Sequence, residues 1–437
     1  MATLEAQVAH IWRRLGFGAT RAQIDAGVNV GTAALIDDLC NRPLTTPAEW
    51  EFPVNTDYTV TEKYMSRMIE LMAYGANPLQ ERIAWILQGL VVIAMDGTVY
   101  LADMRLHVDK LRSSTHGLYG DLLLAISTQP GMLKYLSGYQ NTKAHPNENY
   151  ARELCELFAL GRTHPLTGQA NYTENDVKEM ARALTGWQYN WNTGGTFFQQ
   201  SSWDSGNKTF LGAARGAAKL VDVINAMKQH DSWAYHVPRR FYRELVGLEP
   251  DTNALAQLGQ AFGQNGDLRA LVSAIVHRPE FLSDAAIYSR TKQPVELIAN
   301  TAKLLGITSL NYNLSWLLTD FFGQQPLAAP SVAGWYKGSE WLNTGGMMAW
   351  SSLLSSMIWG KVKWDGTGTY PALAQQLVSQ ATSATAATKA LALTGIINAS
   401  PKTFAALDDY AKAGTWNLQR AAGLLNLTFL TPEYFVN

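Results

Sequence analysis

Acidic residues gather in one predicted helix, 147–161, which begins Asn147-Glu148-Asn149-Tyr150-Ala151-Arg152-Glu153. At about 100° per residue, Glu148, Arg152 and Glu156 share one stripe of this helix, and Glu153 lies beside it. Carboxylates and an arginine on one face could bind a hard divalent cation, or act as an acid and a base with separated pKa values. A solvated face with Glu–Arg pairs four residues apart gives the same pattern, and the pattern alone favours that interpretation.

Two neighbouring segments supply further polar candidates. Thr173 with Asp176 three residues later resembles a capping box at the start of a helix over 173–186, and Asp176 is either a cap-region charge or a site carboxylate. The stretch 203–212 is typical of an Asx-type turn, in which Asp204 and Lys208 could hold an anionic substrate. A lone lysine in a polar turn is usually only solvated.

Aromatic residues mark two long loops, 187–213 and 323–346. Trp187 opens the first loop, where Gly194-Gly195 separates two aromatic stretches and predicts a small hairpin. Trp335 lies in the second loop, which either stacks on a sugar ring or covers core. Long loops often carry function, so both are candidate binding segments.

The elements that would position these residues are helices. Apolar residues recur with helical spacing in the segments 61–75, 78–95, 101–125, 147–161, 173–186, 214–229, 252–263, 266–278, 293–305, 385–398 and 416–429. A helix corner recurs at Pro130, Pro279, Pro401 and Pro432. We therefore expect a mainly α fold: a large multi-helix globular body with a small irregular or hairpin insertion around 187–213. Residues 1–437 would form one unit, with sub-domains 1–186 and 214–437 joined by that aromatic-rich loop.

Composition limits the function classes. The net charge of −1 argues against nucleic-acid binding, because a basic surface is its usual footprint. No apolar run approaches the roughly 20 residues of a membrane span, and the first 18 residues do not have the pattern of a signal peptide.

The two cysteines, Cys40 and Cys155, imply no disulfide framework. The 14 Trp and 18 Tyr are typical either of a glycan-contacting surface or of a Trp-rich core, and we favour the core. No phosphate loop, dinucleotide fingerprint, nucleophile elbow or zinc motif occurs, and the histidines show no ligand spacing.

Together these segments resemble the bacterial domain-of-unknown-function 1800 family. The matching residues run nearly end to end: Arg13-Arg14-Leu15-Gly16-Phe17-Gly18, Asn77-Pro78-Leu79-Gln80-Glu81-Arg82, Leu111-Arg112, Asn147 to Leu154, Tyr172-Thr173-Glu174 with Asp176-Val177, Leu184-Thr185-Gly186-Trp187, Asp204, Gly206 and Lys208 with Leu211-Gly212, Lys292 with Pro294, and Pro330, Val332, Gly334 and Trp335. The resemblance implies a largely helical bacterial protein, often exported and often encoded beside a sulfatase-like partner. It implies no known reaction.

Several positions depart from the family pattern. A Trp-His-Asn-His-like segment is replaced by Trp85-Ile86-Leu87-Gln88, and two further histidines by Ser114 and Trp203. An expected Asp and an expected Arg are Ser137 and Trp350. If the family site places histidines on a metal, this chain lacks them.

Two functions remain open. The first is a binding or assembly protein that presents an aromatic, low-charge surface to a sulfatase-like protein or a glycan. The second is an enzyme with a carboxylate-lined, metal-dependent, hydrolase-like site on helix 147–161. In that site Glu148, Glu153 and Asp176 would be catalytic or would hold a divalent cation. Substrate would contact Asn147, Arg152, Trp187, Asp204, Lys208 and Trp335. Compartment and oligomeric state are not indicated.

Overall fold

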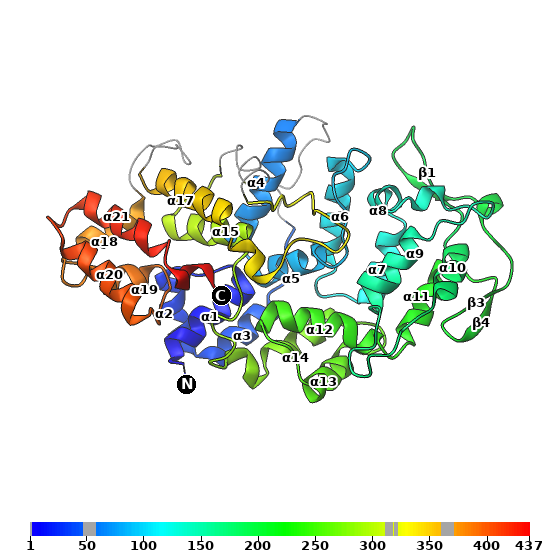
Figure 1. The fold of residues 1–437 in the computed structure, drawn as a ribbon, viewed down its shortest axis with the longest axis horizontal. Helices are drawn as coiled ribbons and strands as arrows, with labels where there is room; N and C mark the ends of the chain where they lie inside the picture. Colours follow the sequence, from blue (N-terminus) through cyan, green and yellow to red (C-terminus); the bar gives the residue numbers. More distant parts are fainter. Residues whose placement is uncertain (1, 47–57, 311–317, 319–321, 360–370) are drawn as a thin grey trace.

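Helices dominate the protein. The computed structural model describes residues 2–46, 58–310, 318, 322–359 and 371–437 (Figure 1). Within these ranges the strands form two separate two-stranded antiparallel sheets. The expected mainly α class with a small strand insertion is therefore confirmed.

The centre of the molecule combines helices from distant parts of the chain. They are α1 (Leu4–Gly16), α2 (Arg21–Val30), α3 (Thr32–Asn41), α4 (Tyr58–Tyr74), α5 (Pro78–Gln88), α6 (Leu101–Ser113), α12 (Trp233–Val246), α13 (Thr252–Phe262), α14 (Leu268–Val276) and α15 (Pro294–Leu305). At one end of the long axis lie α17 (Thr344–Ile358), α18 (Ala372–Gln380), α19 (Ala386–Leu393), α20 (Pro401–Lys412) and α21 (Leu418–Thr428) (Figure 1).

Helix α1 lies in the core and carries charges there. Its N-cap Thr3 accepts a hydrogen bond from the Ala6 N–H, and the helix ends where Phe17 adopts a left-handed conformation, φ 58°. Apolar side chains surround it, but Arg13 and Arg14 are buried as well. Burying a charge is costly unless it finds partners, so these arginines need an explanation.

A buried ion network joins the central helices. Glu296 on α15 pairs with Arg82 on α5 and, at 2.8 and 2.9 Å, with Arg290. Arg290 also reaches Glu244 on α12 at 3.0 Å. Burial opposes ionisation of Glu296, but Arg290 and Arg82 outweigh it and hold the pKa of Glu296 at about 2. The Glu296 carboxylate therefore links α15, α5 and the segment that contains Arg290 through ion pairs.

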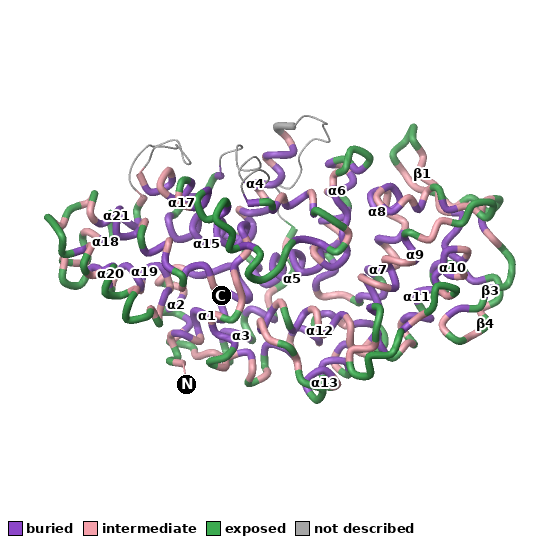
Figure 2. Tube along the Cα trace, in the orientation of Figure 1, coloured by how far each residue is buried: buried purple, intermediate pink, exposed green. Residues whose placement is uncertain are grey.

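The other end of the molecule contains the segment with the sequence-predicted polar residues. It comprises α7 (Tyr119–Ser127), α8 (Pro130–Tyr135), α9 (Asn149–Glu153) continuing as a π-helix (Leu154–Ala159), α10 (Glu174–Ala183), β1 (Trp187–Tyr189), β2 (Thr196–Phe198), β3 (Lys208–Phe210), β4 (Ala213–Gly216) and α11 (Leu220–Lys228). Figure 2 shows a buried helical interior here and an exposed tip on the β1–β2 hairpin, which projects beside α8.

The structure corrects several element boundaries. The expected helix 101–125 is two helices, α6 and α7. The expected helix 214–229 starts only at Leu220, because Ala213–Gly216 pairs with β3. Helix α12, which has Pro238 inside it, was not among the predicted segments, and neither were α1, α2, α3, α17 and α18. The four proline corners are confirmed: Pro130 and Pro401 open α8 and α20, and the other two open 3₁₀ turns at Pro279–Leu282 and Pro432–Phe435.

The interior contains many of the tryptophans and both cysteines. Trp12, Trp85, Trp203, Trp233, Trp335, Trp341 and Trp350 are buried, which supports a Trp-rich core. Cys40 and Cys155 are buried free thiols. Among the described helices, none is long and apolar enough to cross a bilayer.

Candidate functional site

The helix predicted over 147–161 begins at Asn149, with Glu148 as its N-cap residue, and widens at its end. Asn147 Oδ1 accepts the Asn149 N–H at 2.9 Å, and Tyr150, Leu154, Cys155 and Phe158 are buried on its inner face. From Leu154 to Ala159 it is a π-helix, and the N–H groups of Leu160 and Gly161 both reach Cys155 O at 3.0 Å. Short π segments often occur at functional sites.

Arg152 on the outer face of this helix is bound to two carboxylates. Its Nη2 lies 3.0 Å from Glu148 Oε2 and 2.7 Å from Glu174 Oε2, and its Nη1 donates to Glu174 Oε1 at 2.9 Å. The hydrogen bonds with Glu174 raise the pKa of Arg152 and lower the pKa of Glu174. Arg152 thus ties α9 to α10.

Glu153 differs from its neighbours. It is half-buried, and no hydrogen bond or ion pair to its carboxylate is found in the described ranges. Burial, together with the charge of Glu156, raises the pKa of Glu153. A half-buried carboxylate with a raised pKa could act as a proton donor or acceptor.

Asp176 acts as a cap and as a tether. Its Oδ2 accepts hydrogen bonds from the N–H and the hydroxyl of Thr173, both at 2.7 Å, and Asp176 N–H donates to Thr173 Oγ1 at 3.2 Å. Its Oδ1 accepts the Leu211 N–H at 2.8 Å, in the turn between β3 and β4. This carboxylate therefore joins α10 to the second hairpin.

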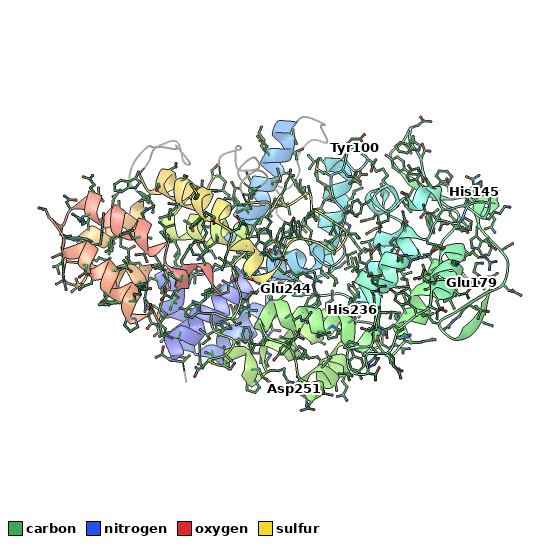
Figure 3. All side chains as sticks on the ribbon, viewed as in Figure 1. Tyr100, His145, Glu179, His236, Glu244 and Asp251 are labelled. Carbon is green, nitrogen blue, oxygen red and sulfur yellow. The ribbon has the colours of Figure 1, made fainter. Side chains whose placement is uncertain are left out.

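Asp204 and Lys208 are held in the same way. Arg182 on α10 donates to Asp204 Oδ2 from Nε at 2.7 Å, and the Gly206 N–H donates to Oδ1 at 2.8 Å in the expected Asx turn. Lys208 is buried, not solvated: its Nζ donates to the carbonyls of Asp204 and Gly206 at 2.6 and 2.8 Å. On the same helix, Glu179 (labelled in Figure 3) accepts the Thr209 N–H at 3.1 Å.

The two predicted tryptophans lie in different parts of the fold. Trp187 is half-buried in β1, with its ring edge-on to Phe198 at 5.5 Å. Trp335 is buried against α5, stacked on Trp85 with ring centroids 4.6 Å apart, and its Nε1 donates to Gln325 O. Trp335 therefore contacts the central helices, whereas the other predicted residues belong to the 147–208 segment.

No metal centre is built by these residues in the described part of the chain. Within the ranges given above, no three His, Cys, Asp or Glu side chains are grouped to hold an ion. The carboxylates of Asp176 and Asp204 already accept hydrogen bonds from protein donors. The carboxylate of Glu148 is paired with Arg152. Gln88, Ser114 and Trp203, where the resemblance led us to expect histidines, are buried, and the Gln88 side chain donates to Pro326 O.

The structure exposes an aromatic residue that the sequence did not single out. Trp191, in the turn between β1 and β2, has 63% of its surface exposed. Its ring is edge-on to Tyr139 at 5.6 Å and to Tyr189 at 4.8 Å, with interplanar angles of 86° for both pairs. Phe197 on β2 is also exposed. The only sequence signal was the aromatic content of the predicted hairpin, which does not say which ring faces solvent.

The aromatic cluster rests on a buried ion pair. Lys134 on α8 pairs with Asp103 on α6, and its Nζ lies 5.0 Å from the ring centre of Tyr100 and 4.8 Å from that of Tyr189. Figure 3 labels Tyr100 at the end of α6 where the helix begins. Cation–π contacts of this kind fix aromatic rings in place. We call Tyr100, Tyr139, Tyr189, Trp191 and Phe197 the aromatic hairpin surface.

One family model matches the chain. It is described as "Protein of unknown function (DUF1800)", and the match covers residues 10–436. Neither a curated protein nor a solved structure matches.

Proposed function

Because the chain belongs to the family described as Protein of unknown function (DUF1800), whose description assigns no reaction, we propose a function from the chain's own surface. The protein binds a neutral glycan through the aromatic hairpin surface. The observation that carries this proposal is the exposed ring of Trp191, held edge-on by two tyrosines.

The fixed position of this ring favours binding. A ring wedged between Tyr139 and Tyr189 has little rotamer freedom left to lose when a ligand stacks on it. Tryptophan also offers a large apolar face together with a polar N–H, which suits a ligand that is apolar on one side and wet on the other. A pyranose ring is such a ligand, with C–H groups on its faces and hydroxyls around its edge.

The surrounding side chains favour a neutral sugar over a charged one. Residues 187–202 contain no charged residue. They do contain the amides Gln188, Asn190, Asn192 and Gln199, which donate and accept hydrogen bonds as sugar hydroxyls require. Asn190 already organises the turn, since its Oδ1 accepts the N–H groups of Asn192 and Thr193 at 3.0 and 3.1 Å. Two exposed lysines from other segments border this stretch: the Lys143 N–H donates to Ser202 O at 2.8 Å, and Lys219 Nζ lies 5.0 Å from the ring centre of Phe198. The proposal of a neutral sugar therefore rests on the uncharged residues of the hairpin itself.

Most of the acidic residues that the sequence predicted for a catalytic site are engaged in structural ties. Glu148, Asp176 and Asp204 each have protein partners that occupy them, so they act as structural ties. Glu153 alone keeps an enzyme as the second candidate, because its carboxylate is half-buried, has a raised pKa and is not ion-paired in the described ranges. In that reading Glu153 would be the general acid of a hydrolase.

The test is affinity electrophoresis of the full chain in gels that contain single soluble polysaccharides, neutral or anionic. We compare the wild type with Trp191→Ala and with Tyr336→Ala, a matched control that removes an aromatic ring of 52% exposure outside the hairpin. We expect a neutral polysaccharide to retard the wild type and Y336A, and W191A to bind about tenfold more weakly, the effect of about 1.4 kcal/mol.

Three outcomes would overturn the proposal. The first is that no neutral polysaccharide retards the wild type. The second is that W191A binds as well as the wild type. The third is that Y336A loses binding and W191A does not. Capture of a co-encoded sulfatase-like protein that W191A abolishes, without any glycan binding, would assign the surface to a protein partner. Hydrolysis of a polysaccharide that Glu153→Gln abolishes would establish the enzyme.

A further inference from the structure

A second exposed ring lies beside the hairpin, on a different element. Tyr100 precedes α6 as its N-cap residue, and 52% of its surface is exposed. Tyr100 and the β1–β2 hairpin lie along the same edge of the molecule (Figure 1, Figure 3). Between them lies the Lys134 ammonium, 5.0 Å from the ring centre of Tyr100 and 4.8 Å from that of Tyr189. The two ring centres are therefore closer together than the sum of these distances.

One buried ion pair fixes the spacing of these rings. Asp103 on α6 pairs with Lys134 on α8, and Asp103 Oδ2 also accepts the Tyr100 N–H at 2.8 Å. Helix α8 packs closely on α6 here, because a Cβ atom at Gly131 would lie only 3.2 Å from Asp103 Cβ. Buried polar groups that are paired in this way are rigid, so Tyr100 and Tyr189 keep a constant distance.

The exposed rings on the two elements are separate stacking platforms. One face of the Tyr100 ring is turned to the Lys134 ammonium, which leaves the opposite face for a ligand. In the described part of the chain Tyr100 makes no ring contact with Tyr189 or Trp191, whereas those two rings are edge-on at 4.8 Å. A pyranose has roughly the size of an aromatic ring, so a single sugar residue cannot stack on both Tyr100 and Trp191.

The charges between the two platforms are neutralised. Lys134 and Asp103 are buried and paired with each other. Asp96, in the turn before α6, is partly exposed, and its Oδ1 already accepts the N–H and the hydroxyl of Thr98 at 2.8 and 2.7 Å. A neutral chain that runs from one ring to the other therefore passes over a compensated ion pair.

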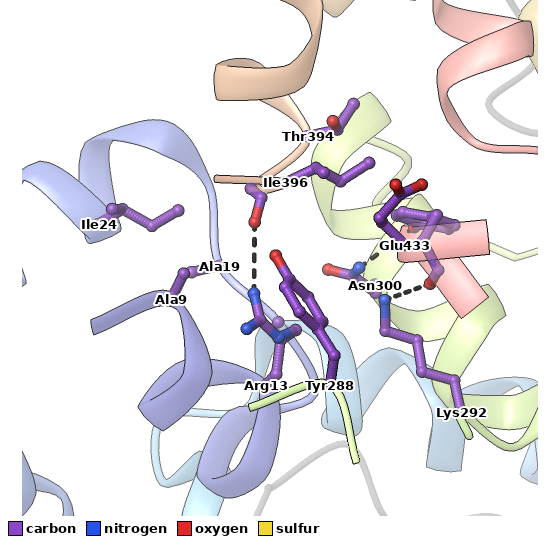
Figure 4. A pocket seen from close by; sticks show the side chains of 13 residues that line it. Ala9, Arg13, Ala19, Ile24, Tyr288, Lys292, Asn300, Thr394, Ile396 and Glu433 are labelled. Atoms are coloured by element: carbon purple, nitrogen blue, oxygen red, sulfur yellow. Dashed lines mark hydrogen bonds between the residues drawn. The ribbon is translucent and has the colours of Figure 1, made fainter. Parts of the chain in front are cut away.

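Hollows elsewhere suit a saccharide chain less. The buried cavity beside Arg13 has a volume of about 10 Å³, which is room for a single water (Figure 4). An open hollow of about 450 Å³ lies beside Tyr235 on α12, but Lys228 and Asp231 line it and bring charge. Tyr235 therefore provides an aromatic control at the larger of these hollows.

We propose that the aromatic hairpin surface binds a linear neutral polysaccharide along its length, with one sugar residue on Trp191 and another residue of the same chain on Tyr100. This inference rests on the proposed function and adds the class of ligand, which is a chain of several sugar residues and not a monosaccharide. The second contact is intramolecular once the first is made. Affinity therefore rises with chain length until both rings are engaged, and then stays constant.

The test is calorimetric titration of the full chain with saccharides of one to six residues, cut from cellulose, xylan and mannan. We expect the wild-type affinity for one of these series to rise with length and to level off. Tyr100→Ala should lower the affinity for the longest chain by about fivefold or more and leave that for the monosaccharide unchanged. Tyr100→Phe keeps the ring and should bind as the wild type does. The matched control is Tyr336→Ala, which removes a ring of the same 52% exposure.

The outcomes separate this inference from the proposed function. If W191A loses binding but the wild-type affinity does not change with length, glycan binding stands and the two-ring inference fails. The inference also fails if Y100A binds the longest chain as tightly as the wild type, or if Tyr235→Ala or Y336A removes the length dependence and Y100A does not. If the wild type binds none of the three series, or if W191A binds them as well as the wild type, both proposals fail. The length dependence of the wild type requires no variant that folds.

Discussion

Lys303→Met should change how the stability of the protein depends on pH. Lys303 is buried, with 8% of its surface exposed, and its ammonium is held by two backbone carbonyls with no ion pair in the described ranges. Burial alone lowers its pKa from 10.5 to about 8. Above pH 8 the folded chain loses this proton while the unfolded chain keeps it up to about pH 10.5, so the unfolded state binds more protons in that window.

The sign and size of the effect follow from this difference. Stability rises with pH wherever the unfolded state holds the extra proton, so the contribution of Lys303 to the free energy of unfolding increases between pH 7.5 and 9.5 by about 2 kcal/mol. Urea unfolding followed by tryptophan fluorescence at these two pH values measures it. The free energy of the wild type should gain about 2 kcal/mol more than that of K303M over this interval, whereas Lys402→Met, at an exposed site, should follow the wild type. Equal pH dependence in the wild type and K303M would refute the argument.

Three further substitutions test the structural roles assigned above. Glu296→Gln leaves two buried arginines without their shared carboxylate and should cost about 3–5 kcal/mol in urea unfolding; a loss under 1 kcal/mol would contradict the buried network. Asp176→Ala removes a cap and the tether to the second hairpin, and should cost about 1–2 kcal/mol and speed amide exchange in β3–β4; unchanged exchange there would show that the tether does not matter. Trp335→Ala empties a buried stack and should cost about 3–5 kcal/mol, while W191A should stay within about 0.5 kcal/mol of the wild type; similar losses for both would contradict their different burial.

The sequence was sufficient where the determinants are local. The Thr173–Asp176 box and the Asx turn at Asp204 involve neighbours two or three residues apart, and both form as predicted. The helix 173–186 was likewise predicted from its apolar spacing. Local hydrogen bonding decides such features, so the sequence shows them directly.

Features that depend on distant segments could not be predicted. Asp176 was recognisable as a cap, but its bond to Leu211 N–H crosses 35 residues. Lys208 was expected to be solvated and is instead enclosed by its own turn, with its Nζ 5.3 Å from the Trp203 ring. Trp335 and Trp191 have the same chemistry, and only tertiary packing buries the first on Trp85 and exposes the second.

The central claim, glycan binding by the aromatic hairpin surface, is tested most directly by isothermal titration calorimetry. The wild type and W191A are titrated with an oligosaccharide of the neutral polysaccharide selected by electrophoresis. We predict saturable binding to the wild type. The affinity of W191A should be at least about tenfold weaker, although this variant unfolds at the same temperature as the wild type. Equal affinities in the two proteins would contradict the account.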